Sequence, residues 1–469
     1  MSGERAVRRA LVVGLAETGV AVARALRAEG WDVTVVEDTP ATTTKYAERV
    51  EAVRATAARI LEAPTDAQIR ELVAGVDLVV PSPLVRPGHA AIVEAVAGGV
   101  AVRSEIDLAA ERARVPIVAV TGTNGKTTVT SMVAAMLEAS GVPAIAAGNI
   151  GRPLIDAVAD ASITSERPGT PPGVIVAEVS SFQLQFAQEA FRPRVAILLA
   201  ITPDHLDWHG SFAGYADAKA RITAFQRADD LLVYDADDER AFAIATGASA
   251  ARRVGVSARA DAEGCYRVVG DRLVLPDGRP LAAFADMSRS LPHDRTNALA
   301  AAAAALEVGA TVDGVVAALR SYATMPHRVA LVGEANGVEW YDDSKATNPD
   351  ATRRAVSSFT SVVLLAGGRN KGLDLSVLAD DESHLRGVVA FGEAAPEIAA
   401  AFARSSTPVE RAANMHDAVG AAARMARAGD VVLLSPACAS FDAYSGYGAR
   451  GDDFAREVRV QVMKEATSR

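Results

Sequence analysis

Short aliphatic segments alternate with alanine-rich amphipathic segments along almost the whole chain, and this pattern constrains the fold more than any other feature. The aliphatic segments are nearly continuous and rich in β-branched residues, which is typical of strands buried on both faces of a parallel sheet. They lie at 11–14, 32–36, 76–80, 117–121, 174–177, 195–200, 362–366, 388–391 and 431–434. Helical patterning fills the intervals, at 20–28, 129–139, 297–306 and 417–426. We therefore expect an α/β fold with several parallel sheets.

The length divides this pattern into domains. A chain of 469 residues is long enough for several domains, and 50% hydrophobic with 23% charged residues is ordinary for a globular protein. We place the domains at 1–104, 105–324 and 325–469. The second contains a small β element at 265–284 and a loop rich in Ser, Pro and Gly at 162–173.

Composition excludes several classes of protein. A net charge of −10 argues against a chain that mainly binds nucleic acid, because phosphate neutralisation needs excess Lys and Arg. Two cysteines, Cys265 and Cys438, exclude a disulfide scaffold and agree with a reducing compartment. No uncharged apolar run of membrane-spanning length occurs, and the first residues lack the apolar core of a signal peptide. We expect a cytoplasmic protein without a membrane span.

The strongest motif follows the strand predicted at 117–120. It reads Thr121-Gly122-Thr123-Asn124-Gly125-Lys126-Thr127-Thr128 and leads into a helix. A glycine-rich turn before a helix N-terminus lets backbone N–H groups surround phosphate oxygens, while the lysine reaches the outer phosphates and the next hydroxyl binds Mg²⁺. The strict P-loop pattern would have glycine where this chain has Val120. We therefore predict a variant loop that binds a nucleoside triphosphate.

Two further predicted strands end in reactive side chains. Glu178 follows the strand at 174–177, and His205 follows the strand at 195–200 within a cluster of acids and histidines. The carboxyl ends of parallel strands are where α/β proteins bind ligands. His205 could bind a metal; since Mg²⁺ prefers oxygen ligands, Mn²⁺ stays open as the metal at this histidine. Lys219, on the next helical segment, is by composition an ordinary surface lysine.

Taken together, these motifs resemble the Mur ligases, the ATP-dependent amide-bond ligases of peptidoglycan precursor synthesis. The resemblance rests on the phosphate loop, on Glu178 with Ser-Ser-Phe-Gln-Leu at 180–184, and on Asp-His-Leu-Asp at 204–207 followed by Lys219. The segments at 325–328, 342–348 and 435–442 are similar to those of the member that adds D-glutamate to UDP-N-acetylmuramoyl-L-alanine. The Asp-Asn-Pro-Arg motif of the member that adds a diamino acid is absent from the sequence.

The resemblance implies an architecture and a set of cofactors. It implies a Rossmann-like N-terminal domain for the UDP end, a central P-loop ATPase-type domain and a Rossmann-like C-terminal domain for the amino acid. It also implies ATP, two Mg²⁺ ions and a lysine carbamylated by CO₂, a modification that needs a neutral amine. Thr127 and Glu178 would hold one Mg²⁺, and His205 and carbamylated Lys219 the other.

The resemblance also assigns residues to each substrate. The catalytic set it implies is Lys126, His205, Lys219 and Arg328. Beside the loop at 122–128, it places Asn297, Arg328 and Asp343 at ATP. It places the UDP substrate at Leu15, Thr18, Glu37, Asp38, Ser82 and Asn149, and D-glutamate at Lys345, Thr347, Lys371, Ser440 and Tyr447. Asp294 departs from the family, which often has asparagine there.

Several interpretations compete with this one. Gly14-Leu15-Ala16-Glu17-Thr18-Gly19 has the outline of a dinucleotide fingerprint, but Ala16 replaces the glycine that lets the backbone approach a pyrophosphate, which disfavours an NAD-dependent oxidoreductase. The two glycines could instead serve only helix–strand packing. Either Glu37 or Asp38 could contact the uridine. A nucleotide switch and a Mur ligase for another amino acid also stay open. We expect a monomeric ligase that works through an acyl phosphate.

Overall fold

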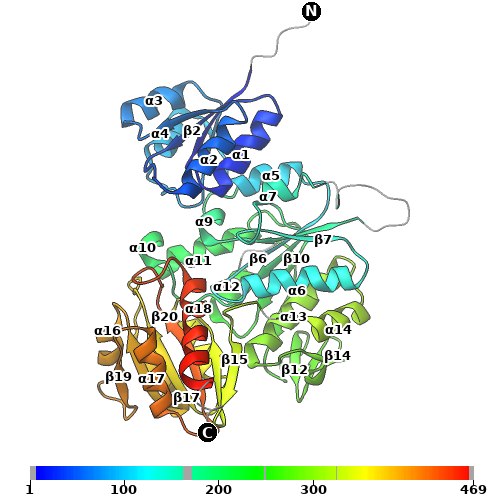
Figure 1. Cartoon of the computed structure of the whole chain (residues 1–469). Helices are drawn as coiled ribbons and strands as arrows, with labels where there is room; N and C mark the ends of the chain where they lie inside the picture. The colour runs from blue at the N-terminus through cyan, green and yellow to red at the C-terminus, as the bar shows by residue number, and fades with distance from the viewer. Residues whose placement is uncertain (1–6, 161, 163–171, 248–249, 324, 464–469) are drawn as a thin grey trace, which may run out of the picture. The chain divides into compact units, whose positions relative to one another are not determined.

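The computed structural model describes residues 7–160, 162, 172–247, 250–323 and 325–463. The chain forms two compact units. The first comprises 1–201, 216–288 and 295–322, and the second comprises 202–215, 289–294 and 323–469. Three separate sheets, of five, nine and six strands, run through these units in the described residues (Figure 1).

The first sheet has five parallel strands in the order β3-β2-β1-β4-β5. The strand order reverses between β1 and β4, so the segments that follow these two strands turn in opposite directions. They leave a crevice at the carboxyl ends of β1 and β4, and folds of this kind bind ligands there. The strands are β1 Arg9–Val13, β2 Asp32–Glu37, β3 Arg59–Glu62, β4 Leu78–Pro81 and β5 Ala101–Val102, and the helices are α1 Glu17–Ala28, α2 Thr44–Arg54, α3 Asp66–Ala74 and α4 Ala90–Gly98.

The second sheet has the order β14-β13-β12-β11-β10-β9-β6-β8-β7. Strands from β7 to β12 pair in parallel, and β12, β13 and β14 pair antiparallel, which is the small β element predicted at 265–284. The strands are β6 Ile117–Thr121, β7 Ala144–Gly148, β8 Val174–Glu178, β9 Val195–Leu198, β10 Leu231–Asp235, β11 Arg252–Ser257, β12 Tyr266–Val269, β13 Arg272–Val274 and β14 Pro280–Ala283. The helices are α5 Glu105–Arg112, α6 Lys126–Ala139, α7 Leu154–Ala157, α9 Ser181–Leu184, α11 Phe212–Ala220, α12 Glu239–Gly247, α13 Pro292–Glu307 and α14 Val312–Ser321, with 3-10 turns Arg221–Thr223 and Phe284–Asp286.

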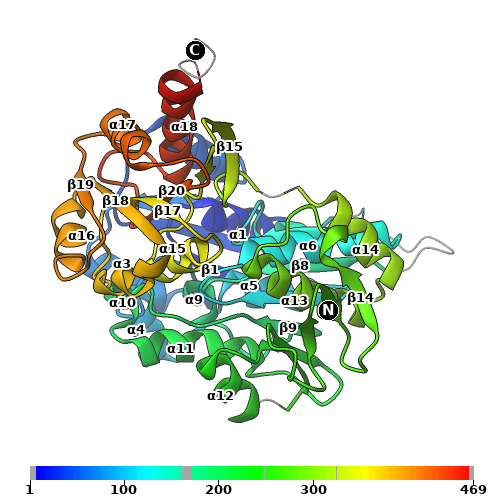
Figure 2. The same cartoon turned by 90° about the horizontal axis from the view of Figure 1, so that it is seen from below.

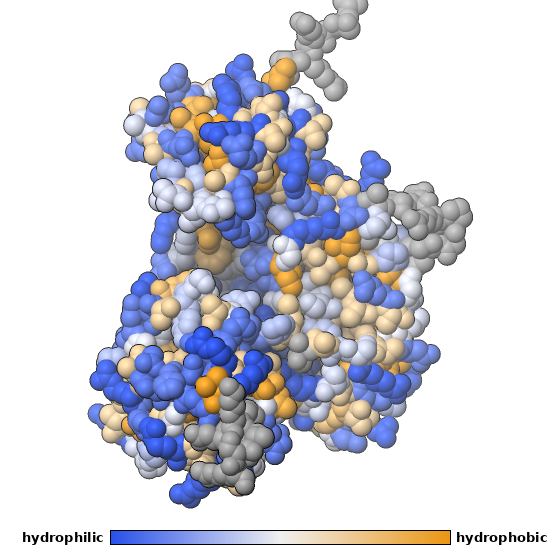
Figure 3. Space-filling model, viewed as in Figure 1, coloured by the Kyte–Doolittle hydropathy of each residue, from blue (hydrophilic) through white to orange (hydrophobic). Residues whose placement is uncertain are grey.

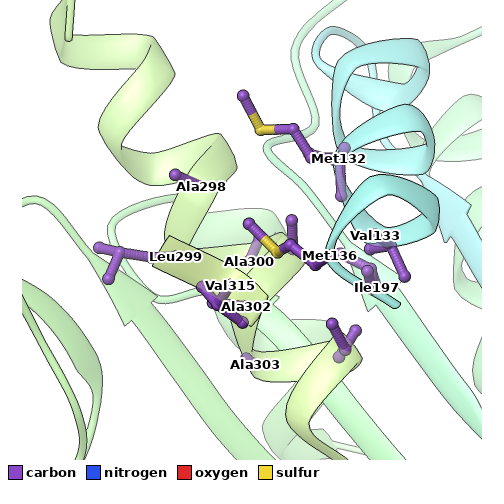
Figure 4. Packing of buried hydrophobic residues seen from close by; sticks show 14 of the residues in the cluster. Met132, Val133, Met136, Ile197, Ala298, Leu299, Ala300, Ala302, Ala303 and Val315 are labelled. Atoms are coloured by element: carbon purple, nitrogen blue, oxygen red, sulfur yellow. The ribbon is translucent and has the colours of Figure 1, made fainter. Parts of the chain in front are cut away.

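The core on one face of this sheet is built from small side chains. Helix α13 buries an unbroken run of alanines at 300–305, and they share one apolar cluster with Met132 and Met136 of α6 and Ile197 of β9 (Figure 4). Helices α6 and α14 pack together in the same layer (Figure 2). Alanines let helices approach closely while the flexible methionines fill the remaining gaps. The low aromatic content of 5% is therefore compatible with a densely packed core.

The third sheet belongs to the second unit and has the order β15-β16-β20-β17-β18-β19, with only β15 and β16 pairing antiparallel. Its strands are β15 Ala330–Ala335, β16 Val338–Asp342, β17 Val362–Gly367, β18 Leu385–Phe391, β19 Val409–Arg411 and β20 Val431–Ala437. Its helices are α15 Pro349–Val356, α16 Ala395–Ala401, α17 Met415–Met425 and α18 Tyr447–Val458, with a 3-10 segment Ser376–His384 and a π-helical turn Arg459–Met463; the short α10 Leu206–His209 belongs to the same unit.

The predicted α/β class with parallel sheets is confirmed. The predicted domain boundaries fall between β5 and α5 and before β15, and they stay predictions; residue 324, and residues 163–171 of the predicted loop, lie outside the described residues. None of the helices that the structure describes is both long and apolar enough to cross a membrane. The face in Figure 3 is largely hydrophilic, with apolar residues scattered over it.

Candidate active site

The predicted phosphate loop lies between strand β6 and helix α6, at the carboxyl edge of the second sheet. Gly125 is the residue before the helix and has φ +84°, and Gly122 has φ +150°. A Cβ atom on Gly122 would lie 2.5 Å from Cβ of Leu199, so both glycines are required by the turn. Lys126 Nζ donates to the carbonyls of Gly122 and Thr123, each at 2.8 Å. The Lys126 side chain thus folds back over the loop in which it is predicted to contact the outer phosphates.

Glu178 ends strand β8 and pairs in register with Val120 of β6, directly beside the phosphate loop. The side chain is 3% exposed. Its Oε1 accepts a hydrogen bond from Asn149 Nδ2 at 2.8 Å, whereas its Oε2 has no hydrogen-bond partner in the described part of the chain. A buried carboxylate oxygen without a partner is costly unless a cation binds it. Glu178 therefore fits its predicted role as a Mg²⁺ ligand, and Asn149, predicted at the UDP substrate, holds it in place.

The residues after Glu178 have a structural purpose. Ser180 caps the short helix α9, since its Oγ accepts from the backbone N–H of Gln183 while Gln183 Oε1 accepts from the N–H of Ser180. This capping box fixes the direction of the chain as it leaves β8. Part of the motif at 180–184 thus forms the turn that presents Glu178.

Lys219 is buried, with 1% of its surface exposed, although composition alone would place it on the surface. Its Nζ donates to the carbonyl of Gly122 at 2.7 Å and lies 3.5 Å from Oγ1 of Thr121. Helix α11 thus brings the lysine to the phosphate loop. The burial and the hydrogen bond place the amine at the loop, as the predicted carbamylation requires, and the modification itself stays a prediction.

Asn297, predicted near the adenine, also lies at the loop. A Cβ atom on Gly125 would stand 2.7 Å from Asn297 Oδ1, which shows how closely helix α13 approaches the turn. Glu178, Lys219 and Asn297 are therefore brought together at one loop, although they are far apart in sequence.

The predicted UDP-substrate residues other than Asn149 lie at the crevice of the first sheet, whereas Asn149 lies after strand β7 of the second sheet. Leu15 N donates to Glu37 Oε2 at 2.7 Å, and Ser82 Oγ donates to the carbonyl of Gly14 at 3.0 Å. Asp38 Oδ2 lies 2.9 Å from His89 Nε2. The side chain of Glu37 thus accepts a hydrogen bond from the backbone after strand β1, whereas the side chain of Asp38 is half exposed beside His89.

Glycine spacing in this crevice has a packing reason, and Thr18 lies on the helix that follows it. A Cβ atom on Gly19 would stand 2.0 Å from the carbonyl oxygen of Gly14. Gly19 therefore lets helix α1 approach the end of β1 closely. Thr18 lies in the first turn of α1.

In the second unit, Asp204 is the centre of a polar cluster. Its carboxylate accepts from Lys371 Nζ at 2.8 Å and from Asn348 Nδ2 at 3.3 Å, and its neighbour His205 has φ +51°. Burial would raise the pKa of Asp204, but the charges of Lys371 and His205 outweigh it and the pKa is lowered. Lys371, predicted to bind D-glutamate, is therefore held by a buried carboxylate.

Arg328 and Asp343, both predicted at ATP, are neighbours in the same unit. Asp343 accepts from Ser435 Oγ at 2.8 Å and from the backbone N–H of Val329 at 3.3 Å. Burial raises the pKa of Asp343 to about 7, against the opposing effects of Ser435 and of the Arg328 charge.

Two of the remaining predicted D-glutamate residues meet where helix α18 begins. Lys345 Nζ stands 3.9 Å from the centroid of the Tyr447 ring, a cation–π contact. Ser344 Oγ donates to the carbonyl of Tyr447 at 2.8 Å and so ties the 342–348 segment to this helix. Thr347 lies two residues after Lys345 in that segment. Ser440 is buried just after strand β20.

Sequence reasoning missed Arg450, which is fully buried in helix α18. Its guanidinium donates to Ser344 Oγ at 2.9 Å, to the carbonyl of Ser344 at 2.9 Å and to the carbonyl of Cys438 at 3.1 Å. Burial lowers the pKa of Arg450 to about 10. The signal was the four-residue spacing of Arg450 with Phe454 and Val458, which places all three on one face of the helix.

The predicted metal ligands are divided between the two units. Thr127, Glu178 and Lys219 lie in the first unit and His205 lies in the second. Across the described residues, no group of three His, Cys, Asp or Glu side chains is arranged to hold a metal. The predicted sets rely on a threonine hydroxyl and a carbamate, and they stay predictions.

Comparison with known families and proteins decides the assignment. Residues 120–305 match the Mur ligase middle domain, and residues 327–438 match the Mur ligase glutamate ligase domain. The chain is 42% identical over 464 residues to UDP-N-acetylmuramoylalanine--D-glutamate ligase of Frankia casuarinae, covering 96% of this chain and 94% of that protein. The chain belongs to the Mur ligase family.

Further similarities support the architecture of this Mur ligase. The protein of Thermobifida fusca with the same name is 40% identical, covering 97% of this chain and 98% of its own length. Among solved structures, UDP-N-acetylmuramate-alanine ligase MurC of Thermotoga maritima is 20% identical with a TM-score of 0.56, covering 96% of this chain and 99% of its own. The MurF ligase of the same organism, solved in complex with ADP, is 15% identical with a TM-score of 0.56, covering 93% of this chain and 96% of its own. The predicted three-domain α/β fold is confirmed.

Proposed function

We propose that this Mur ligase joins D-glutamate to UDP-N-acetylmuramoyl-L-alanine, using ATP, in the synthesis of a peptidoglycan precursor. One observation carries the proposal: a phosphate loop, a carboxylate with an unpartnered oxygen and a buried lysine lie together at the end of one sheet, within the described residues. Relatives named for this reaction match nearly the whole chain.

The proposed reaction has two steps. The terminal carboxylate of the alanyl substrate attacks the γ-phosphorus of ATP, and the bond to the bridging oxygen breaks, giving an acyl phosphate and ADP. The amine of D-glutamate then attacks the acyl carbon. The tetrahedral intermediate loses a proton and expels phosphate, and the amide is formed. The acyl phosphate must be kept from water until the amine arrives.

The phosphate loop would perform the first step largely by positioning. The backbone N–H groups of 122–128 would surround the phosphates, and Lys126 would turn from the loop carbonyls towards their negative charge. Asn297 would stand at the adenine side of the loop, and Arg328 and Asp343 would complete the nucleotide site. The carboxylate and the triphosphate repel each other, so their charges must be neutralised.

Mg²⁺ would supply part of this neutralisation at the phosphate oxygens. Thr127 and Glu178 would hold one ion, since Glu178 has an oxygen without a partner in the described residues. His205 and carbamylated Lys219 would hold the second ion, for which Mn²⁺ could substitute.

The second unit would bind the amino acid. Lys371 is held by Asp204 in the described structure, and a carboxylate of D-glutamate would take over that pairing. Lys345, Thr347, Ser440 and Tyr447 would surround the rest of the molecule. The crevice of the first sheet, with Leu15, Thr18, Glu37, Asp38 and Ser82, and Asn149 beyond it, would take the UDP substrate. We also propose a monomer in the cytoplasm, which gel filtration and fractionation would test.

A phosphate-release assay tests the proposal. Purified protein with ATP, Mg²⁺, UDP-N-acetylmuramoyl-L-alanine and D-glutamate should release phosphate, and omission of any one component should stop it. Mass spectrometry of the UDP-linked product should show that its mass exceeds that of UDP-N-acetylmuramoyl-L-alanine by one glutamyl residue.

A panel of amino acids separates the competing functions. Turnover with L-glutamate but not D-glutamate would overturn the specificity. Turnover of UDP-N-acetylmuramate with L-alanine, or of a longer acceptor with a diamino acid, would assign another ligase of this family. Binding of NADH to the first domain would favour an oxidoreductase, and ATP binding without turnover on any substrate would favour a nucleotide switch.

A further inference from the structure

Arg328 lies in a backbone segment with unusual geometry. Its neighbours His327 and Val329 have φ angles of +61° and +49°, in the left-handed region that favours glycine. A β-branched residue such as Val329 is rarely found there, and such conformations persist only where surrounding contacts impose them. The contacts that impose them therefore decide where Arg328 points.

Arg289 contacts two of the carbonyl groups of this segment. One nitrogen of its guanidinium, Nη1, donates to the carbonyl oxygens of Arg328 at 2.7 Å and Val329 at 2.8 Å. The same guanidinium donates from Nε and Nη2 to the two carboxylate oxygens of Asp294, each at 2.7 Å. The planar fork of Arg289 thus joins Asp294 to the backbone at Arg328, a geometry that a lysine could not reproduce.

The remaining groups of the segment are held by other residues. The N–H of Val329 donates to Asp343 at 3.3 Å, and the carbonyl of His327 accepts from the N–H of Lys345 at 3.1 Å. The ring of His327 lies 2.6 Å from Asp342. Arg289 thus supplies the side-chain contact that spans two successive carbonyls at the centre of the segment.

The charges around Arg289 are balanced. Asp294 is 2% exposed and accepts also from the N–H of Leu291 at 3.1 Å. Burial, aided by the charges of Arg289 and Arg328, lowers the pKa of the neighbouring His293 despite the opposing charge of Asp294. Arg289 and Asp294 form an ion pair of opposite charges, so the pair can hold the backbone without adding a net charge beside Arg328.

We propose that Arg289, anchored by Asp294, is a positioning residue that fixes the strained backbone on either side of Arg328 and thereby aims the Arg328 guanidinium at an anionic ligand. This inference rests on the proposed ligase function, in which Arg328 reaches the γ-phosphate. Arg289 touches no substrate in this scheme and acts through Arg328. A misplacement of about 1 Å in such a group can lower a rate as much as about a hundredfold.

Steady-state kinetics of Arg289→Gln test the proposal. We expect kcat to fall by about tenfold or more while the KM values for D-glutamate and the UDP substrate stay within about twofold, since only transition-state stabilisation is lost. Arg289→Lys keeps the charge but not the fork and should give an intermediate loss. The matched control is Arg192→Gln, because Arg192 pairs through Nε and Nη2 with the equally buried Asp230 and is similarly exposed. That control should keep its kcat.

A double-mutant cycle and hydrogen exchange make the test decisive. In an Arg328→Ala background, Arg289→Gln should cause no further loss of kcat, because the residue through which it acts is gone. Amide hydrogen exchange of peptides covering 327–335 should become faster in Arg289→Gln and stay unchanged in Arg192→Gln.

Independent, additive losses in the cycle, or a normal kcat with unchanged exchange, would overturn the inference. If the wild-type protein ligates no amino acid at all, the proposed function fails. The exchange comparison would then still decide whether Arg289 fixes the segment.

Discussion

Glu105 and Glu178 are both buried, and each has one carboxylate oxygen without a hydrogen-bond partner in the described residues. Glu105 Oε1 accepts from the backbone N–H of Ile155 at 2.7 Å, and burial raises the pKa of Glu105 to about 7. Glu178 instead lies beside the phosphate loop. A proton can satisfy the free oxygen of Glu105, whereas a bound cation suits that of Glu178.

Glu178→Gln tests this difference. We expect kcat/KM to fall by about a hundredfold or more, and the rise in melting temperature on adding Mg²⁺ and ATP to disappear, because the neutral amide is a poorer metal ligand. Glu105→Gln, which is equally buried, should keep its activity and its Mg²⁺ response. Equal responses in both variants would remove Glu178 from the metal site.

Lys219 combines full burial with a hydrogen bond to the loop carbonyl of Gly122 at 2.7 Å. A carbamate keeps one N–H, so that hydrogen bond can survive the modification while two anionic oxygens are added.

Lys219→Met keeps the side-chain volume and should lower kcat by about a hundredfold or more without loss of fold, because the proposed ligand for the second metal ion is removed. Wild-type protein in ¹³C-bicarbonate should show a carbamate resonance by NMR that the variant lacks. Full activity of the variant, or the same resonance in both proteins, would exclude the carbamate.

At the scale of elements, helix α6 is flanked by two left-handed glycines with different surroundings. Gly125 precedes the helix with φ +84°, and its Cβ would meet Asn297 and Leu199. Gly141 follows the helix with φ +76°, and nothing in the described residues lies within 4 Å of its Cβ. The first position therefore combines backbone strain with steric conflict, and the second has strain alone.

Gly141→Ala should cost about 1 kcal/mol of unfolding free energy and leave nucleotide binding unchanged. Gly125→Ala should cost more and weaken binding of a fluorescent ATP analogue by at least about tenfold, because the loop must shift to accommodate the methyl group. Denaturant unfolding and titration measure the two effects. Unaltered ATP binding in Gly125→Ala would contradict the assigned role of the loop.

For the whole molecule, helix α5 follows the last strand of the first sheet in the chain and is held by buried carboxylates against segments that flank the second sheet. Glu105 accepts from the N–H of Ile155, and Asp107 accepts from the N–H groups of Gln188 at 2.8 Å and Phe191 at 3.2 Å. These contacts fasten α5 to helix α7 and to the segment that precedes strand β9. Because the pKa of Glu105 differs between the folded and the unfolded chain, its protonation contributes to stability.

The stability should therefore depend on pH in a defined direction. The pKa of Glu105 rises from 4.5 to about 7 on folding, so the folded state binds more protons between these values, and stability falls as pH rises through this window. The full shift corresponds to about 3 kcal/mol at most. Asp343 contributes in the same direction, because burial also raises its pKa to about 7.

Glu105→Gln should flatten this part of the curve, so that the variant gains stability relative to wild type as pH increases from about 4.5 to about 7. Urea unfolding at several pH values measures the difference. As a control, the substitution Glu48→Gln at an exposed position should give a stability–pH curve parallel to that of the wild type. A Glu105→Gln curve that also runs parallel to wild type would show that folding does not raise the pKa of Glu105.

The sequence alone was sufficient for the α/β class, for many of the buried strands and for the glycine turn before helix α6, because these depend on local patterns: β-branched runs, helical spacing, and glycines before a helix. It did not single out strands such as β7, β10 and β11, and it did not give the order of strands in any sheet. Glu178 could be singled out because it ends a buried parallel strand, and the carboxyl ends of such strands are where α/β proteins bind ligands. Lys219 was recognisable only by resemblance, since nothing in its local sequence distinguishes it from a surface lysine.

Only the tertiary structure decided which charged side chains are buried and what they contact. Nothing in the local sequence distinguishes Arg289 and Arg450 from surface arginines. In the structure, Arg289 donates hydrogen bonds to the carbonyls of Arg328 and Val329, and Arg450 is fully buried and donates to the carbonyl of Ser344. The Glu178 oxygen that has no partner among the residues described, and the pairing of Lys371 with Asp204, also follow from the tertiary structure alone. Local patterns specify elements because backbone geometry is periodic, whereas hydrogen-bond partners far apart in sequence are determined only when packing brings them together.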